Sequence, residues 1–253
     1  YPYVPSYVCN TTTYRYTSFI QNSSLRIMNI AIIPARGGSK RIPRKNIKDF
    51  HGKPIIAYSI EAAKQSGCFD RIIVSTDDEE ILGVAKAYGA EVPFLRPAKI
   101  SDDHATTMDV MQHAIKHFAE QGCRPTLVCC IYPTAPFLLP EYLQQGQLEL
   151  NNSEVEYTFS ATSFPYPIQR AFNVTDMGRV EMFNSKYSIT RSQDLTEAYH
   201  DAGQFYWGKA SAFIQGKAIF AEHSKAVILP RKRVQDIDTP EDWELAEALF
   251  SVL

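Results

Sequence analysis

The sequence predicts an α/β fold in which a mostly parallel sheet carries helices on both faces. From residue 28 onward, short β-rich runs alternate with segments of helical periodicity, the pattern of consecutive strand and helix units. The run from Leu127 to Tyr132 is apolar on both faces, as expected for a central strand buried between two helical layers. Glycine follows three of the helical segments, at Gly67, Gly89 and Gly122, where helices commonly end.

In the first part of the chain the predicted elements alternate regularly. The predicted strands span 29–33, 71–76, 91–95, 127–132 and 157–162. The predicted helices between them span 54–66, 78–88, 106–121 and 140–150.

The regular pattern then breaks in a segment rich in Pro, Phe and Tyr. We expect residues 164–200 to form an inserted lobe, with a hairpin around Asp176, Met177 and Gly178. Regular structure returns with strands over 204–207 and 226–229, a helix over 209–215 and a last helix from Pro240. Thr239 and Asp242 are placed as a capping box for that last helix.

The composition excludes several classes of protein. A net charge of −2 gives no overall field for binding nucleic acid, and no apolar run reaches the roughly 20 residues that cross a bilayer. The five cysteines lack zinc-ligand spacing and are typical of reduced core residues, which indicates a cytoplasmic protein. Residues 1–27 have no acidic residue and no apolar period, so we expect a non-native or disordered leader before a domain spanning 28–253.

A loop rich in glycine and basic residues follows the first strand. Between Arg36 and Asn46 it holds Gly37, Gly38 and five cationic side chains. Glycines let the backbone approach a phosphate, and cations neutralise an anion of several charges. The loop matches neither the P-loop nor the dinucleotide-binding glycine pattern. A solvated basic loop is the alternative, but the position after a buried strand, where open α/β sheets bind ligands, favours phosphate binding.

Two acidic residues near the C-terminus form a second candidate site. In an extended segment, residues two apart share a face, so Asp236 and Asp238 project together while Ile237 turns to the core. Two carboxylates suit Mg²⁺ that also holds substrate phosphates. The alternative is that Asp238 only complements the dipole of the helix that follows, which leaves Asp236 without a role.

Together these motifs resemble the acylneuraminate cytidylyltransferase family. The matching segments are Pro34 to Asn46, Phe69 to Asp77, Leu95 to Pro97, Pro133 to Pro136 and Asp236 to Thr239. Within the family the chain is most similar to the bacterial pseudaminic acid cytidylyltransferases, through Ser163 to Arg170, Arg191 to Asp194 and Tyr199 to Gly208. The resemblance implies a nucleotide-diphospho-sugar transferase fold, a three-layer α/β structure whose inserted lobe completes a homodimer.

The resemblance also implies roles for individual residues. The triphosphate of CTP would be held by Arg36, Ser39, Lys40 and Lys45, and Asn46 would touch the ribose or the phosphates. The cytosine would be read by Arg96, Thr107 and the backbone at Ala105. Mg²⁺ would be carried by Asp236 and Asp238, which with Arg36 and Lys45 form the predicted catalytic set. The acidic nine-carbon sugar would meet Tyr132, Gln169, Arg170, Arg191, Gln204 and Tyr206.

The expected reaction is attack by the anomeric hydroxyl of the sugar acid on the α-phosphorus of CTP, releasing pyrophosphate. The sequence departs from the sialate enzymes at Tyr132 and at Asp201 to Gln204, which favours pseudaminic acid over N-acetylneuraminic acid. Legionaminic or N-acetylneuraminic acid as the sugar is the enzymatic alternative. A nucleotide-binding regulator without turnover is the alternative from another class, and the pair of aspartates disfavours it.

Overall fold

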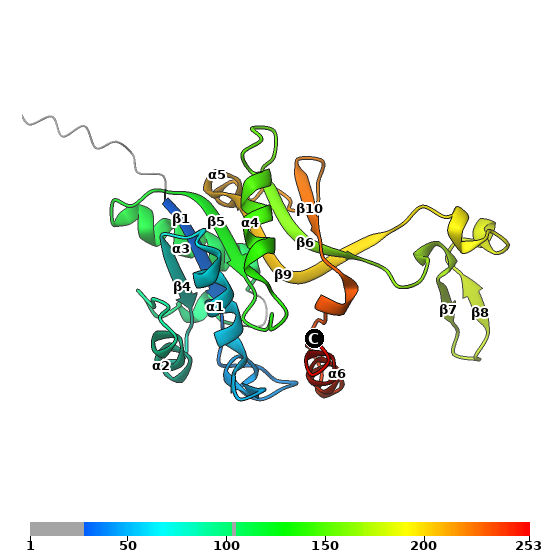
Figure 1. Cartoon of the computed structure of the whole chain (residues 1–253), viewed down its shortest axis with the longest axis horizontal. Helices are drawn as coiled ribbons and strands as arrows, with labels where there is room; N and C mark the ends of the chain where they lie inside the picture. Colours follow the sequence, from blue (N-terminus) through cyan, green and yellow to red (C-terminus); the bar gives the residue numbers. More distant parts are fainter. Residues whose placement is uncertain (1–27, 103–104) are drawn as a thin grey trace, which may run out of the picture.

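The computed structural model describes residues 28–102 and 105–253. Its centre is a six-stranded sheet with the strand order β10-β6-β9-β5-β1-β4 (Figure 1). These strands are β1 (Met28–Pro34), β4 (Arg71–Ser75), β5 (Pro125–Ile131), β6 (Tyr157–Ser163), β9 (Tyr199–Lys209) and β10 (Ser224–Ile228). Only β9 runs antiparallel to its neighbours within this sheet, so the prediction of a mostly parallel α/β sheet is confirmed.

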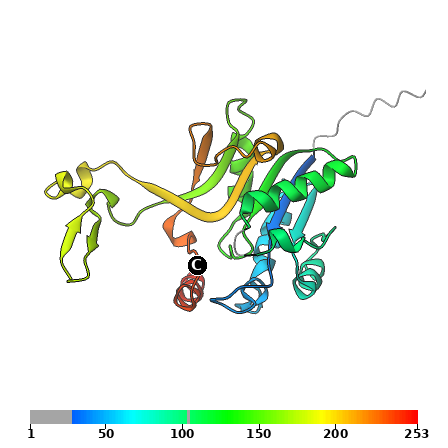
Figure 2. The same ribbon diagram turned by 180° about the vertical axis from the view of Figure 1, so that it is seen from behind.

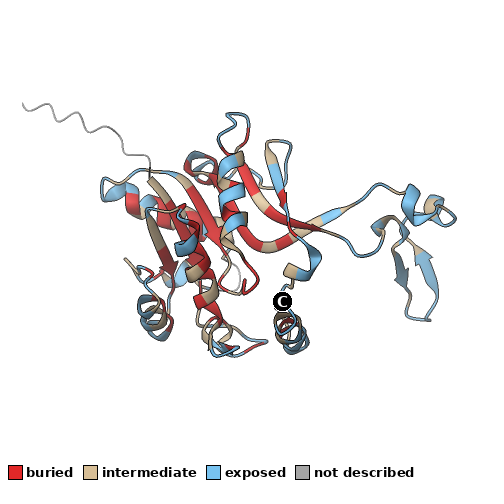
Figure 3. Ribbon diagram, viewed as in Figure 1, coloured by how far each residue is buried: buried red, intermediate tan, exposed pale blue. Residues whose placement is uncertain are grey.

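Helices cover both faces of the sheet because the strands are apolar on both faces. In β1, Ile30 and Ile32 pack on one side, whereas Ala31 and Ile33 pack on the other. One layer holds α1 (Ile55–Ser66), α2 (Glu79–Ala87) and α4 (Pro140–Glu149), and the opposite layer holds α3 (Thr107–Glu120) and α5 (Ala210–Ile214) (Figures 1 and 2). The buried residues follow the sheet and the inner faces of these helices (Figure 3).

Two strand predictions differ from the structure. Residues 91–95 form no named strand; they make isolated parallel bridges, Ile73 to Glu91 and Thr76 to Leu95. Pro93 between them has no N–H to donate to a ladder. Conversely, the strand predicted over 204–207 is the middle of the much longer β9, which lies between two partner strands along its course.

A lobe leaves the sheet between β6 and β9 and stands away from the rest of the described chain (Figures 1 and 2). It contains the antiparallel hairpin of β7 (Phe172–Val174) and β8 (Val180–Met182), which confirms the predicted turn. Gly178 sits in that turn with φ of 73°. Most residues of the lobe are exposed (Figure 3). The role of the lobe in dimerisation stays a prediction.

The last helix, α6 (Pro240–Phe250), closes a third apolar cluster against the short hairpin of β2 (Asp49–Phe50) and β3 (Lys53–Pro54). The ring centroids of Phe50 and Trp243 lie 5.4 Å apart. The predicted capping box is present, because Thr239 and Asp242 bond reciprocally at the start of α6. This packing fixes the residues just before α6, including both candidate metal ligands. No helix among the described residues is long and apolar enough to span a membrane, and the predicted leader lies outside those residues.

Candidate active site

A cavity of about 550 Å³ opens at the carboxyl ends of β1 and β5. Its walls come from segments distant in the sequence: the basic loop, the residues after β5, the start of α3 and the acidic segment before α6. The predicted residues that line it are Arg36, Ser39, Lys40, Lys45, Asn46, Arg96, Ala105, Thr107, Tyr132 and Asp238. The structure therefore brings together all the residues predicted for CTP with one of the two predicted for the metal.

The basic loop is held in shape by contacts of its own. Asn46 is buried, and its side-chain Nδ2 donates to the carbonyl of Arg36 at 3.0 Å, which ties the two ends of the loop together. The Lys45 ammonium donates to the carbonyl of Ile237 at 2.6 Å and lies 3.3 Å from Asp238 Oδ1. The loop thus contacts the acidic segment directly.

The acidic segment has the alternation that the sequence predicts. Ile237 is fully buried, so the side chains on either side of it, Asp236 and Asp238, turn away from the core. Partial loss of water, followed by repulsion from Asp238, raises the pKa of the Asp236 carboxyl, while Lys45 opposes the shift. Arg41 pairs with Asp238 at 2.8 Å.

Arg96 presents a buried cation to the cavity. Its side chain is 3% exposed, and its nearest ion-pair partner is Asp77 at 3.6 Å. Arg96 Nε also donates to Ser101 Oγ at 3.2 Å. Burial lowers the pKa of the guanidinium, and Asp77 opposes that shift. The guanidinium carries several N–H donors in a fixed plane, which suits it to a positioned acceptor on a ligand in the cavity.

Ala105 and Thr107 meet the cavity in different ways. The Ala105 N–H donates to Asp102 Oδ1 at 2.9 Å, so its backbone donor already has a protein partner. Thr107 Oγ1 lies 3.4 Å from the hydroxyl of Tyr132. These contacts join the predicted cytosine site to the predicted sugar site.

The residues predicted for the sugar are not all in one place. Tyr132 lines the cavity, and its ring centroid lies 5.4 Å from that of Tyr206, which is buried behind it. The Tyr206 hydroxyl donates to Asp201 Oδ2. Gln204 is buried at 3% exposure and donates to the carbonyl of Arg233 at 2.5 Å. Tyr206 and Gln204 therefore lie behind the cavity wall.

The other three predicted sugar residues lie on the lobe, outside the cavity of their own chain. Gln169 Nε2 donates to the carbonyl of Thr196 at 2.7 Å within the lobe. Arg191 pairs with Asp194 at 2.9 Å, and Arg170 is exposed. Their roles stay predictions.

Comparison with known proteins gives the family. The model of the family described as "Cytidylyltransferase" matches residues 30–249. The chain belongs to the cytidylyltransferase family. This cytidylyltransferase is 50% identical, over 88% of its length and 97% of the relative's, to a pseudaminic acid cytidylyltransferase of Campylobacter jejuni. A CMP-N,N'-diacetyllegionaminic acid synthase of Legionella pneumophila is 31% identical over 88% of this chain and 96% of its own.

Solved structures support the fold of the cytidylyltransferase. A CMP:2-keto-3-deoxy-manno-octonic acid synthetase, solved with CTP, matches with a TM-score of 0.64 and 17% identity, covering 89% of this chain and 99% of that one. A 4-diphosphocytidyl-2C-methyl-D-erythritol synthase from Anaerococcus prevotii matches with a TM-score of 0.60 and 16% identity, over 89% of this chain and 99% of its own. Both show the α/β architecture inferred from the sequence.

The donor set of the cytidylyltransferase fits a hard divalent cation bound partly by substrate. Loss of water raises the pKa of the Asp236 carboxyl, and repulsion from Asp238 adds to the shift, so the two carboxylates interact. Among residues 28–102 and 105–253 there is no group of three or more His, Cys, Asp or Glu side chains that could hold a metal. Two carboxylates supply part of an octahedral shell, and phosphate and water oxygens suit the rest.

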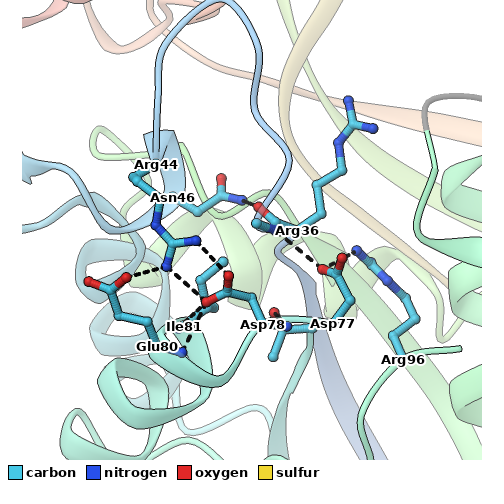
Figure 4. Close-up of polar contacts among 10 residues, drawn as sticks. Arg36, Arg44, Asn46, Asp77, Asp78, Glu80, Ile81 and Arg96 are labelled. Carbon is cyan, nitrogen blue, oxygen red and sulfur yellow. Dashed lines mark hydrogen bonds and ion pairs between the residues drawn. The ribbon is translucent and has the colours of Figure 1, made fainter. Parts of the chain in front are cut away.

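The sequence analysis gave no individual role to three acidic residues and assigned one cation to the wrong partner. Asp77 and Asp78 lie two and three residues after the end of β4, at the same end of the sheet as the basic loop, and that adjacency was the signal available. Asp201 holds Tyr206. Arg44, counted among the cations facing an anion, instead pairs with Asp78 and Glu80 (Figure 4). The neutralising charge of the loop comes from its other members.

Proposed function

We propose that this enzyme transfers CMP from CTP to the anomeric hydroxyl of pseudaminic acid, forming CMP-pseudaminic acid and pyrophosphate. The observation that carries the proposal is the cavity itself. It gathers the glycine-rich basic loop, the buried cation Arg96 and the carboxylate of Asp238 at one sheet edge. Such a site suits a nucleoside triphosphate whose α-phosphorus is attacked near an acidic pair.

Different residues of the chain would bind the triphosphate and the metal ion. The new bond joins the anomeric oxygen to the α-phosphorus while the proton of that hydroxyl passes to solvent. The bond from the α-phosphorus to the oxygen shared with the β-phosphorus breaks, and pyrophosphate leaves with that oxygen. Arg36, Lys40 and Lys45 hold the triphosphate and stabilise the negative charge that gathers on departing pyrophosphate. Asp236 and Asp238 would hold Mg²⁺, which when bound supplies charge neutralisation at the phosphates and acidifies the attacking hydroxyl.

The sugar is inferred from similarity and from one residue of the cavity. Of the relatives named for pseudaminic acid, two from Campylobacter jejuni are 50% and 51% identical to this chain, and one from Helicobacter pylori is 40% identical. The relatives from Legionella pneumophila and Escherichia coli, named for legionaminic acid and N-acylneuraminate, are 31% identical. Tyr132 places a half-buried aromatic ring in the cavity. That ring suits the methyl-ended side chain of pseudaminic acid better than a fully hydroxylated tail.

We also propose that the enzyme works as a homodimer in which the lobe packs on a second copy. The lobe exposes large apolar side chains, among them Tyr166 at 80%, Met177 at 78%, Phe183 at 77% and Ile189 at 93%. A surface with this many exposed apolar groups is typical of an interface. Packing of this kind would let Arg170 and Arg191 approach the cavity of the partner. Size-exclusion chromatography with light scattering should give twice the chain mass, and a single chain mass at micromolar concentration would reject the dimer.

The cytoplasm is the proposed compartment. The four cysteines among the described residues, Cys68, Cys123, Cys129 and Cys130, are all free. Free cysteines persist in a reducing compartment.

A substrate panel tests the proposed reaction. Pyrophosphate release should be fastest with CTP, Mg²⁺ and pseudaminic acid, and kcat/KM for N-acetylneuraminic acid should be lower by a large factor. Legionaminic acid belongs in the same panel. A preference for either of the other sugars would change the substrate but keep the cytidylyl transfer. No release with any sugar, together with tight CTP binding, would favour a regulator.

A further inference from the structure

The two acidic residues after β4, Asp77 and Asp78, bind the basic loop near its two ends (Figure 4). At the first end, the Gly37 N–H donates to Asp77 Oδ1 at 3.2 Å. At the far end, the Arg44 guanidinium makes a bidentate ion pair with Asp78, which we call the fork. In it Nη1 donates to Oδ2 at 2.5 Å and Nη2 donates to Oδ1 at 2.8 Å. The loop is therefore bound to the corner between β4 and α2.

Asp78 is itself fixed by the start of α2. Its Oδ1 accepts from the N–H groups of Glu80 at 3.0 Å and Ile81 at 2.9 Å, as an N-cap residue does. The pairing with Arg44 is the main cause that lowers the pKa of the Asp78 carboxyl to about 2. The carboxylate is thus a fixed, ionised anchor at neutral pH.

The basic loop packs closely against the Asp78 carboxylate at two positions, Gly37 and Arg44. A Cβ built on Gly37 would lie 2.5 Å from Asp78 Oδ2, so only glycine lets the backbone rest against that carboxylate. Arg44 has φ of 56° and ψ of 29°, a left-handed conformation that non-glycine residues rarely keep unless the surroundings impose it. The next two residues, Lys45 and Asn46, line the cavity.

We propose that Arg44 and Asp78 are positioning residues for the triphosphate: they set the shape of the basic loop without touching the nucleotide. Neither lines the cavity. The fork holds Arg44 in its unusual conformation, and that conformation directs Lys45 and Asn46 into the site. The inference rests on the proposed function, because it assigns the loop to the phosphates of CTP.

Four variants separate positioning from charge and from stability. Asp78→Asn keeps an N-cap side chain but weakens the fork. Arg44→Lys keeps the charge but cannot fork. Arg44→Gly accepts the left-handed conformation without strain and loses the fork. The fourth is the double variant Arg44→Gly/Asp78→Asn.

A matched control removes a similar ion pair elsewhere. Arg71 at the start of β4 makes a bidentate ion pair with Glu91, and neither residue lines the cavity. Arg71→Ala should lose stability much as the loop variants do, with CTP affinity unchanged.

The measurements are the Kd for CTP and for inorganic tripolyphosphate by calorimetry, kcat/KM for both substrates, and melting temperature. Each single variant of the fork should bind both phosphate ligands about tenfold more weakly or worse, with KM for the sugar acid nearly unchanged. The double variant should bind no more weakly than Arg44→Gly alone, because Arg44→Gly already removes the whole contact between Arg44 and Asp78, together with the contact to Glu80.

Three results would overturn the positioning role: normal affinity in Arg44→Lys, losses that multiply in the double variant, or an equal loss of affinity in Arg71→Ala. If the proposed function were wrong, the wild-type enzyme itself would release no pyrophosphate from CTP. The positioning role would in that case still be decided by the affinity of the variants for tripolyphosphate.

Discussion

At the scale of single residues, the acidic pair before α6 is the clearest target. Asp236 and Asp238 flank a fully buried Ile237, so replacing either carboxylate should leave the packing intact. We expect Asp236→Asn and Asp238→Asn each to reduce turnover about a hundredfold or more with normal circular dichroism, because half of the proposed metal ligands is lost. Steady-state assays at limiting Mg²⁺ test this. Near-normal activity of both variants would reject the metal assignment.

The Arg44 to Asp78 pair makes a prediction about pH. The pKa of Asp78 is lowered from 3.8 to about 2, so the folded state binds this proton less readily than the unfolded state does. The stabilisation is therefore complete above the unfolded pKa and is lost as pH falls towards 2. We expect Asp78→Asn to lower the free energy of unfolding at pH 7.

Denaturant titrations at several pH values measure this difference. The gap between wild type and Asp78→Asn should shrink below the unfolded pKa of 3.8. A gap that stays constant down to the lowest pH at which both proteins fold would contradict the ion pair as its source.

Residue types and spacing predicted much of the site, but not the partners of each charge. Gly37, Lys45 and Asp238 could be placed because each lies beside a strand end or an extended segment. The direction of Arg44 could not be predicted, because its partner Asp78 lies 34 residues away and either charge could have faced solvent. Gln204 was predicted to contact the sugar, but β9 extends beyond the predicted strand and places its side chain inside the fold.

At the scale of elements, α6 acts as the support of the acidic segment. Thr239 Oγ1 accepts from the Asp242 N–H at 3.2 Å, and the Asp242 carboxylate accepts from the Asp238 N–H at 3.1 Å. We expect Thr239→Ala to destabilise the protein by about 1 kcal/mol, as loss of an N-cap does. It should also reduce activity, since Asp238 then has a looser backbone.

A thermal melt measures the first effect, and an assay at saturating CTP over a range of Mg²⁺ concentrations measures the second. Thr106→Ala is a control for stability alone, because Thr106 caps α3 in the same way but also lines the cavity. Its melting temperature should fall similarly. If Thr239→Ala lost stability without any change in the Mg²⁺ requirement, α6 would support the fold but not the acidic pair.

Elements were predicted best where one periodicity ran uninterrupted. β5 and α3 match their predicted ranges to within about two residues. Residues 91–95 failed because apolar content suggested a strand, while Pro93 removes the donor that a ladder needs. The order of strands could not be predicted at all, since β9 enters the sheet from a distant part of the chain.

At the scale of the whole molecule, the family match begins at Ile30, just after the described residues begin. We expect deletion of residues 1–27 to leave melting temperature and activity nearly unchanged, because that segment carries no core pattern. Differential scanning calorimetry of the shortened and full chains decides the point. A clear loss of melting temperature would show that the segment packs on the domain.

The central place of β9 has a consequence for synthesis on the ribosome. β5 and β6 are both complete by residue 163, but the strand that joins them extends only from Tyr199 to Lys209. Until that strand emerges, the nascent chain presents the open edge of a half-built sheet, and open edges recruit other chains. Translational pausing across the lobe would prolong this exposed stage, so the yield of native enzyme should depend on how fast the lobe is translated.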